Sequence, residues 1–155
     1  MLAITLTETG RTQGGQLGPW PWAVNAGGEG NWFASAAEAE SYARSRLAAG
    51  AANLDLGCFQ LNWRWHGAAF GSVAEMLDPL ANARYAAGFL ARLYQETGDW
   101  SAAAGAYHSR TPVYATRYRA RFDDMLAVAQ GMAGGTGELT LAEATPRLRG
   151  TAFPL

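Results

Sequence analysis

The chain has 155 residues, which is enough for one domain with a substantial buried core. Apolar residues make up 49% of it and charged residues only 16%, a balance that excludes an intrinsically disordered chain. The net charge is −1 and all twelve basic residues are arginine, so no overall positive field would attract nucleic acid or an anionic membrane.

Disulfides, metal sites and membrane spans have little support in the sequence. Cys58 is the one cysteine, and His66 and His108 are the two histidines, too few for a disulfide, a multi-cysteine zinc site or a His-rich metal site. No apolar run reaches the ~20 residues that a membrane-spanning helix needs. No signal peptide is visible, because Met1 leads directly into an apolar segment without a basic region. We therefore expect no disulfide, no multi-cysteine or His-rich metal site, no nucleic-acid partner and no membrane span.

Helix signals occur along most of the chain. Capping boxes begin at Ser35 and Ser72, and Asp78-Pro79 and Thr111-Pro112 are typical of the first residues of two longer helices. Asp99 can cap another helix. Apolar residues then recur at helical spacing, which predicts a mostly α chain. The expected buried stripes are Ala36, Ala39, Tyr42, Ala43 and Leu47; Leu80, Ala83, Ala87, Leu90 and Tyr94; and Tyr114, Tyr118, Phe122, Met125, Leu126 and Ala129.

Three stretches interrupt the helical pattern. Residues 18–34 contain prolines, tryptophans and Asn25-Ala26-Gly27-Gly28, which predicts a hairpin or a lobed loop. Residues 53–65 are more typical of a loop or a short extended piece that lines something. After Gln130 glycines become frequent, so we expect a domain over residues 1–130 and a flexible tail over residues 131–155, with one helical turn near residues 140–144.

Carboxylates are the best candidates for chemistry, because no Ser-His-Asp, Cys-His or phosphate-loop spacing is present. Most of the thirteen have a simple explanation as helix caps, solvated helix faces or tail residues, and Glu8 and Asp55 remain. Glu8 ends an apolar segment just before Gly10. At a helix C-terminus the dipole disfavours the charged form, and a raised pKa is what a general acid needs. On the residues alone, a plain surface glutamate remains the simpler interpretation.

Tryptophan is the second signal. Five of the six lie in the least helical third of the chain, where they could stack on sugar rings or fill a core. Amide side chains lie near them, so a groove for a neutral, hydroxyl-rich ligand is as plausible as core packing. These tryptophans are Trp20, Trp22, Trp32, Trp63 and Trp65, and the amides are Asn31, Asn53, Gln60 and Asn62.

Four short motifs resemble those of lytic transglycosylases with the soluble-lytic-transglycosylase (SLT) domain, in the lysozyme-like superfamily. Glu8-Thr9-Gly10-Arg11 resembles the family's Glu-Ser-Gly element, and Gly57-Cys58-Phe59-Gln60-Leu61-Asn62 resembles Gly-Leu-Met-Gln-Ile-Asn. Ala106-Tyr107-His108 stands where the family has Ala-Tyr-Asn, and Thr116-Arg117-Tyr118 resembles Thr-Arg-x-Tyr. Their order and spacing agree across residues 4–128.

The chain departs from the family pattern at three places. Thr9 replaces Ser, a conservative exchange of one hydroxyl for another. His108 replaces Asn, which makes its contact with a ligand pH-dependent. The family's helix before the catalytic glutamate is also longer than the segment Met1–Thr7.

The resemblance implies a mostly α, lysozyme-like domain with a small β-hairpin or loop lobe. It implies cleavage of the β-1,4 bond between N-acetylmuramic acid and N-acetylglucosamine in peptidoglycan, with formation of a 1,6-anhydro ring and no metal or cofactor. Glu8 would act as general acid and then base, and Tyr118 would orient it. The implied substrate-binding residues are Thr9, Trp22, Gln60, Asn62, Trp63, Tyr107 and His108.

Two other functions remain open. Asp55 could activate water if it faces the same cleft, which would make the protein a hydrolytic muramidase, although a turn-forming Asp before Gly57 is the favoured interpretation. The chain could instead be a non-catalytic glycan-binding module in a flagellar, secretion or phage-like assembly. In each case the expected partner is the peptidoglycan glycan strand. The expected location is the periplasm or cell envelope after export, and the expected state is a monomer.

Overall fold

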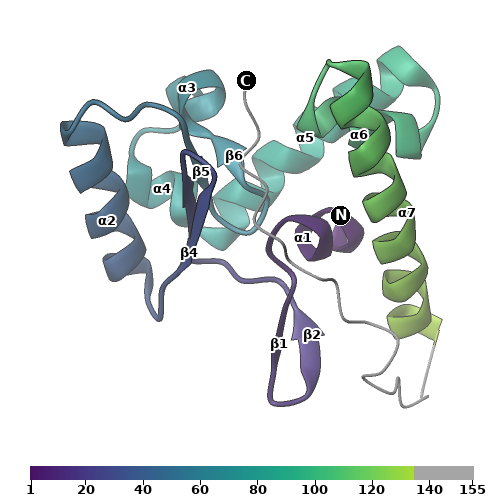
Figure 1. Cartoon of the computed structure of the whole chain (residues 1–155), viewed down its shortest axis with the longest axis horizontal. Helices are drawn as coiled ribbons and strands as arrows, with labels where there is room; N and C mark the ends of the chain where they lie inside the picture. Colours follow the sequence, from purple (N-terminus) through teal and green to yellow (C-terminus); the bar gives the residue numbers. More distant parts are fainter. Residues whose placement is uncertain (135–155) are drawn as a thin grey trace.

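The computed structural model describes residues 1–134, and helices make up most of this part (Figure 1). Within it, no helix combines the length and the hydropathy needed to cross a membrane. The last helix passes the expected domain boundary at Gln130 and ends at Gly134. The rest of the expected tail, with its helical turn near residues 140–144, lies outside the described residues. The helices are α1 (Leu2–Thr9), α2 (Ala36–Ala48), α3 (Trp63–His66), the 3-10 helix η1 (Gly67–Ala69), α4 (Val73–Leu77), α5 (Pro79–Thr97), α6 (Trp100–His108) and α7 (Pro112–Gly134).

The predicted helix starts are confirmed by their caps. The Ser35 hydroxyl accepts a hydrogen bond from the Glu38 amide, and the Ser72 hydroxyl accepts one from the Glu75 amide. The carboxylates of these two glutamates reach one residue further back than in a standard capping box, to the amides of Ala34 and Gly71. As predicted, the side chains of Asp78 and Asp99 cap α5 and α6.

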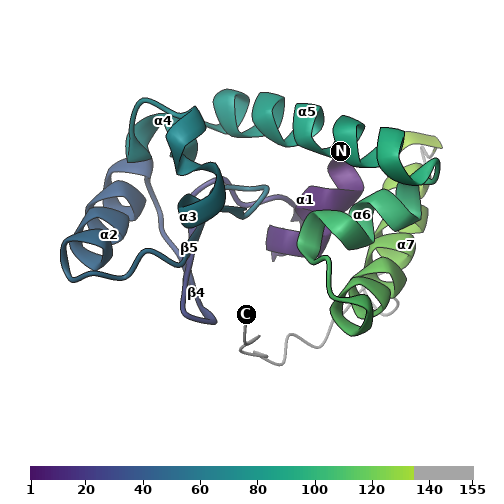
Figure 2. The ribbon, with the colours of Figure 1, turned by 90° about the horizontal axis from the view of Figure 1, so that it is seen from above.

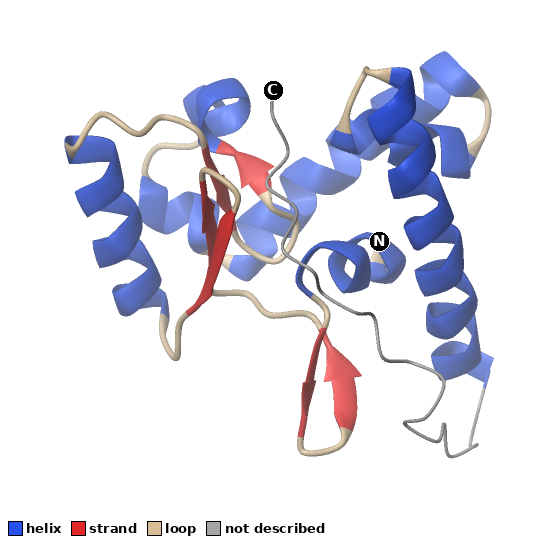
Figure 3. Cartoon of the chain, viewed as in Figure 1, coloured by secondary structure: helices blue, strands red, loops and turns tan. Residues whose placement is uncertain are grey.

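The strands form a four-stranded antiparallel sheet and a separate hairpin, which Figure 3 shows in red. The sheet has the order β4-β3-β5-β6, and the predicted hairpin is its β3–β4 pair, closed by Gly27 and Gly28 at positive φ. The second hairpin, β1–β2, was not predicted; it closes in the same way at Gly14-Gly15. The strands are β1 (Arg11–Gln13), β2 (Gln16–Gly18), β3 (Ala23–Ala26), β4 (Glu29–Trp32), β5 (Leu54–Leu56) and β6 (Leu61–Asn62).

Helix α5 joins the two halves of the fold. It extends from α4, beside the sheet and α2, to α6, which packs with α7, and α7 in turn packs on α1 (Figures 1 and 2). The predicted buried face of α7 is confirmed at Tyr118, Phe122 and Ala129. Glu8 at the end of α1 is thereby brought next to the first half of α7.

The predicted buried face of α5 is wrong at its first turn. Leu80, expected inside, is 56% exposed, whereas Asn82 is fully buried together with Ala86, Leu90 and Leu93. The apolar pattern missed this face because its first buried position holds a polar residue. Tertiary hydrogen bonds of the Asn82 amide, which the pattern does not contain, decide the orientation.

The Asn82 side chain joins α5 to the loop between β5 and β6. Its Nδ2 donates to the carbonyls of Met76 at 2.8 Å and Leu56 at 3.1 Å. Its Oδ1 accepts from the Phe59 amide at 3.0 Å and faces the Cys58 thiol. Gly57 lies directly against this amide and has φ of +79°. A Cβ added to Gly57 would lie only 2.7 Å from Asn82 Nδ2, so no larger residue fits here. One buried side chain thus holds the loop that carries Gln60.

We predict that Asn82→Ala destabilises the fold by about 3 kcal/mol or more, because several buried backbone groups lose their partners. Urea unfolding followed by circular dichroism measures this change. Gln95→Ala, on the exposed face of the same helix, is the control and should shift the free energy of unfolding by less than about 0.5 kcal/mol. Equal, small effects of the two substitutions would contradict the role assigned to Asn82.

Candidate functional site

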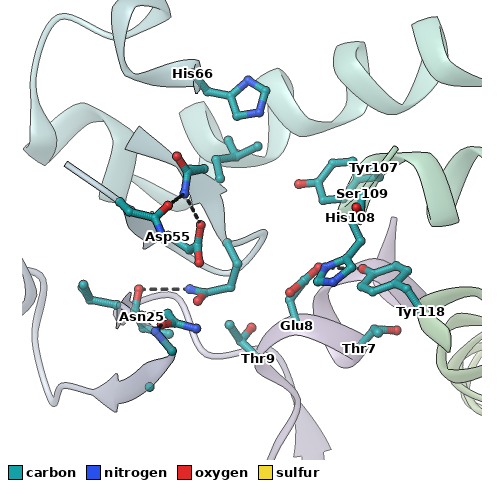
Figure 4. Close-up of a pocket in the computed structure, with 18 of the residues that line it drawn as sticks. Thr7, Glu8, Thr9, Asn25, Asp55, His66, Tyr107, His108, Ser109 and Tyr118 are labelled. Carbon is teal, nitrogen blue, oxygen red and sulfur yellow. Dashed lines mark hydrogen bonds between the residues drawn. The ribbon is translucent and has the colours of Figure 1, made fainter. Parts of the chain in front are cut away.

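A cleft of about 860 Å³ separates the sheet from α1, α6 and α7. The end of α1 forms its floor, the β3–β4 hairpin, β5, β6 and α3 form one wall, and the α6–α7 junction forms the other. Figure 4 shows Glu8, Tyr118, His108 and Tyr107 on one side and Asp55 and Asn25 on the other. The cleft therefore gathers residues from five separate segments of the chain, the fifth being Phe89 of α5.

Glu8 and Tyr118 form the tightest polar contact that crosses between elements in this cleft. The Tyr118 hydroxyl donates to Glu8 Oε1 at 2.6 Å, across 110 positions of sequence. Tyr118 is itself buried, and its ring stacks in parallel on His108 with centroids 4.7 Å apart. Gly10, which follows the end of α1, is also required, since an added Cβ would lie 2.3 Å from the Leu6 carbonyl oxygen.

The pKa of Glu8 is raised from 4.5 to about 7. Burial of the carboxyl is the largest cause, and the negative charge of Asp55 adds to it. The Tyr118 hydrogen bond and the positive charge of Arg121 act in the opposite direction. A carboxyl with such a pKa holds a proton near neutral pH and can also give it up, so it can serve as both acid and base.

Thr9 lines the cleft but has a structural role. Its hydroxyl donates to the Cys58 carbonyl at 3.0 Å and to the Thr5 carbonyl, and accepts from the Trp20 amide. The side chain is buried, with only 2% exposed. Thr9 therefore ties the end of α1 to the loop before β6, and its expected contact with a substrate stays a prediction.

Gln60 lies at the cleft in a conformation that its own hydrogen bonds support. It has φ of +46°, unusual for a residue other than glycine. Its Nε2 donates to the Gly57 carbonyl at 2.8 Å and to the Ala23 carbonyl at 3.3 Å, which binds the loop to β3. The side chain is thus held in one orientation at the cleft wall.

Tyr107 and His108 lie at the C-terminal end of α6 and line the cleft together. The Tyr107 hydroxyl donates to the Phe59 carbonyl at 2.8 Å, so α6 holds the same loop that Asn82 holds from the other side. Burial lowers the pKa of His108, and the positive charge of Arg121 lowers it further. His108 is therefore favoured in its neutral form next to Tyr118.

The expected turn role of Asp55 is wrong. Asp55 lies in strand β5, paired with Asn25 and Asn62, and its side chain lines the cleft. Its Oδ1 accepts a hydrogen bond of 2.7 Å from Asn62 Nδ2, which also donates to Asn53. Burial raises the pKa of Asp55, and the Asn62 hydrogen bond opposes that rise. Strand pairing, which a local turn pattern does not report, turns this carboxyl toward the cleft.

Two predicted tryptophan contacts are not at the cleft. Trp22 packs against the core and lines a separate hollow of about 350 Å³ with Trp20. Trp63 packs on Gly67, where an added Cβ would lie 2.8 Å from the indole ring, and on the core. Both rings serve packing, whereas Trp32 and Trp65 line the cleft and are 40% and 66% exposed.

Sequence reasoning missed several lining residues. Arg121 follows Tyr118 by three residues on α7, so helical spacing could have placed it on the same face. His66 and Phe89 pack against each other, and Nδ1 of His66 is 3.0 Å from the Tyr85 hydroxyl. No sequence motif pointed to His66 and Phe89, because their contact depends on how α3 packs against α5. Among residues 1–134, no three His, Cys, Asp or Glu side chains gather as metal ligands would.

The comparisons with known proteins match residues 22–116 to the Transglycosylase SLT domain. Neither the curated proteins nor the solved structures contain a match. The matched segment includes Asp55, Gln60, Tyr107 and His108, whereas Glu8 and Tyr118 lie on either side of it. Since the match covers more than half of the chain, and the fold is mostly α and lysozyme-like as predicted, the chain belongs to the transglycosylase SLT domain family.

Proposed function

We propose that the protein is a lytic transglycosylase that cleaves the β-1,4 bond between N-acetylmuramic acid and N-acetylglucosamine in peptidoglycan. Members of the SLT domain family act on this polymer. The observation that carries the finer assignment is the half-buried Glu8 carboxyl, with a pKa near 7 and a 2.6 Å hydrogen bond from Tyr118, on the floor of the cleft. The partner is then the glycan strand and the place of action the cell envelope.

Glu8 would act twice in this reaction. Its protonated carboxyl donates a proton to the glycosidic oxygen as the bond from that oxygen to C1 of muramic acid breaks, and the N-acetylglucosamine end leaves as an alcohol. The Glu8 carboxylate then accepts the proton of the C6 hydroxyl while the C6 oxygen bonds to C1. The ring closes and Glu8 is protonated again. Ring closure within one sugar has a large effective-concentration advantage over attack by water.

The surrounding residues would prepare Glu8 and hold the sugars. The Tyr118 hydroxyl keeps the carboxyl in one position and stabilises its charged form, which the second step requires. Gln60, Asn62, Tyr107 and His108 line the cleft beside it and offer polar groups and ring faces to a saccharide. Trp32 and Trp65 have exposed indoles at the same cleft, on the sheet side.

A hydrolytic muramidase is the second candidate, and the position of Asp55 favours it. Asp55 faces the same cleft from the sheet side, and its negative charge contributes to the raised pKa of Glu8. A second carboxylate in such a place could activate water or act as a nucleophile, as in two-carboxylate glycosidases. The family's transglycosylase activity favours ring closure, and the products distinguish the two reactions. A non-catalytic glycan-binding module would have no use for a carboxyl with a pKa near neutrality.

Glu8→Gln should lower the rate of peptidoglycan solubilisation by ~10²-fold or more, because it removes the proton that the glycosidic oxygen must receive. Turbidity clearance of purified peptidoglycan measures the rate. Glu96→Gln, an exposed change of the same kind on α5, is the control and should leave the rate unchanged. A Glu8→Gln protein that clears peptidoglycan at nearly the wild-type rate would refute the assignment.

The same variant has a thermodynamic signature. In the folded protein the pKa of Glu8 lies above the ordinary value of 4.5, so its contribution to stability is present below 4.5 and lost as the pH rises through about 7. Gln does not ionise. The Tm of Glu8→Gln relative to wild type should therefore increase across this pH range, as measured by scanning calorimetry.

Tyr118→Phe tests the supporting role, because it keeps the packed ring and deletes the hydrogen bond. In the wild type kcat/KM should fall as the pH rises through about 7, where Glu8 loses its proton. The Tyr118 hydrogen bond lowers the pKa of Glu8, so its loss should move this alkaline limb to higher pH and reduce the maximal rate. Tyr94→Phe, away from the cleft, is the matched control. Unchanged rate, pH profile and Tm would leave Tyr118 with a packing role alone.

The reaction products test the choice between the two enzymes. We expect 1,6-anhydromuramoyl ends, each lighter by one water than a hydrolysed end, in mass spectra of the released fragments. Asp55→Asn should change the ratio of the two kinds of end very little, because ring closure needs no base for water. Mainly reducing ends in the wild type, lost in Asp55→Asn, would instead identify the muramidase.

A further inference from the structure

Arg121 brings a guanidinium to the cleft that the proposed reaction does not use. It lies on α7 one turn after Tyr118 and lines the cleft. Its Nη2 donates to the Thr7 carbonyl at 2.9 Å, the carbonyl that directly precedes Glu8. The side chain, though exposed, is therefore attached to α1 beside the carboxyl that would protonate the substrate.

The positive charge of Arg121 acts on the site. It lowers the pKa values of both Glu8 and His108. A protonated Glu8, which the first step requires, does not neutralise it. Arg121 is the one arginine among the cleft-lining residues that the structure describes, and the whole sequence contains no lysine. It belongs to none of the ion pairs within residues 1–134, which are Arg44–Glu40, Arg110–Glu96 and Arg119–Asp99.

The opposite wall of the cleft is acidic. Glu29 in β4 and Asp55 in β5 line the cleft from the sheet side, whereas Arg121 lines it from α7. An anionic group on a bound saccharide would be repelled by the sheet side and attracted toward α7. The charges of the cleft thus favour one orientation of an anionic saccharide, with its anionic group toward α7.

We propose that Arg121 binds a carboxylate on the lactyl arm of muramic acid, and so selects this sugar over N-acetylglucosamine next to Glu8. The inference rests on the proposed function. The two sugars differ by this arm, which ends in a carboxylate in peptide-free strands and continues into the stem peptide, with its own carboxylates, in intact strands. A guanidinium matches the planar geometry of a carboxylate and offers it two parallel N–H donors.

The test measures binding rather than turnover, in a Glu8→Gln background whose neutral side chain imitates protonated Glu8. Three ligands are titrated by calorimetry: chitohexaose, which has no carboxylate; a peptide-free hexasaccharide of alternating N-acetylglucosamine and N-acetylmuramic acid; and the same hexasaccharide carrying stem peptides. Arg121→Gln, Arg121→Lys and the control Arg84→Gln are compared. Arg84 is exposed on α5 and does not line the cleft. Arg84→Gln changes the net charge by the same amount as Arg121→Gln.

Arg121→Gln should raise the Kd of the muramic acid ligands about tenfold, as expected for loss of a hydrogen bond to a charged group, and leave chitohexaose unchanged. Arg121→Lys should retain most of the binding, and Arg84→Gln all of it. A loss with the peptide-free hexasaccharide identifies the lactyl carboxylate as the group bound, and a loss with the peptide-bearing one alone identifies the stem peptide.

Two results would overturn the proposal. Equal weakening of chitohexaose and the muramic acid ligands would mean that Arg121 acts by holding Thr7 and Glu8 in place. Unchanged binding of all three ligands would exclude any contact with a carboxylate. If the Glu8→Gln parent bound none of the three glycans, the proposed function itself would fail, and the inference with it.

Discussion

The buried amide of Asn82 is the interaction on which the cleft depends. A loop that must present Gln60 to one side and a carbonyl to Tyr107 on the other has several backbone groups with no strand or helix partner of their own. Asn82 accepts a hydrogen bond from this loop and donates one to the end of β5, and Gly57 allows the amide to come close. An unpaired buried polar group is costly, so this arrangement favours one loop conformation over alternatives that would break these hydrogen bonds. A buried side chain of the core thus fixes the position of the cleft wall.

Opposing electrostatic effects then set the acidity of Glu8. Burial and the negative charge of Asp55 favour its protonated form, whereas the Tyr118 hydroxyl and Arg121 favour the charged one. A carboxyl that first donates and then accepts a proton needs a pKa near the working pH. Neither the effects that raise the pKa of Glu8 nor those that lower it would alone give such a value. Arg121 lines the same cleft, and its charge limits the rise in the pKa of Glu8. If Arg121 binds a substrate anion as proposed, one side chain would couple acid strength to substrate preference.

The two carboxylates of the cleft have different environments. Glu8 accepts from a phenol and Asp55 from an amide, and Glu8 lies on the floor of the cleft whereas Asp55 lies on the sheet side. This asymmetry is compatible with a single acid–base residue assisted by a charged neighbour, and also with a pair that shares the work. Family membership favours the first arrangement, and the position of Asp55 is what keeps the second chemically reasonable.

The sequence by itself determined the longer helices, their caps, the β3–β4 hairpin and the family resemblance, because these depend on local patterns: capping residues, apolar spacing and short motifs. It did not predict α3 (Trp63–His66), which begins inside residues 53–65, where a loop or extended piece was expected. It also singled out Glu8 as one of two carboxylates without a simple explanation, but linked it to Tyr118, 110 positions away, only through that resemblance. The tertiary structure alone decided which face of α5 is buried, since a polar Asn82 breaks the apolar stripe. It also decided that Asp55 faces the cleft and that the Thr9 hydroxyl hydrogen-bonds to backbone groups of three other residues. It placed Trp32 and Trp65 at the cleft, rather than Trp22 and Trp63. Each of these depends on partners brought together from distant segments, and no local pattern encodes such pairing.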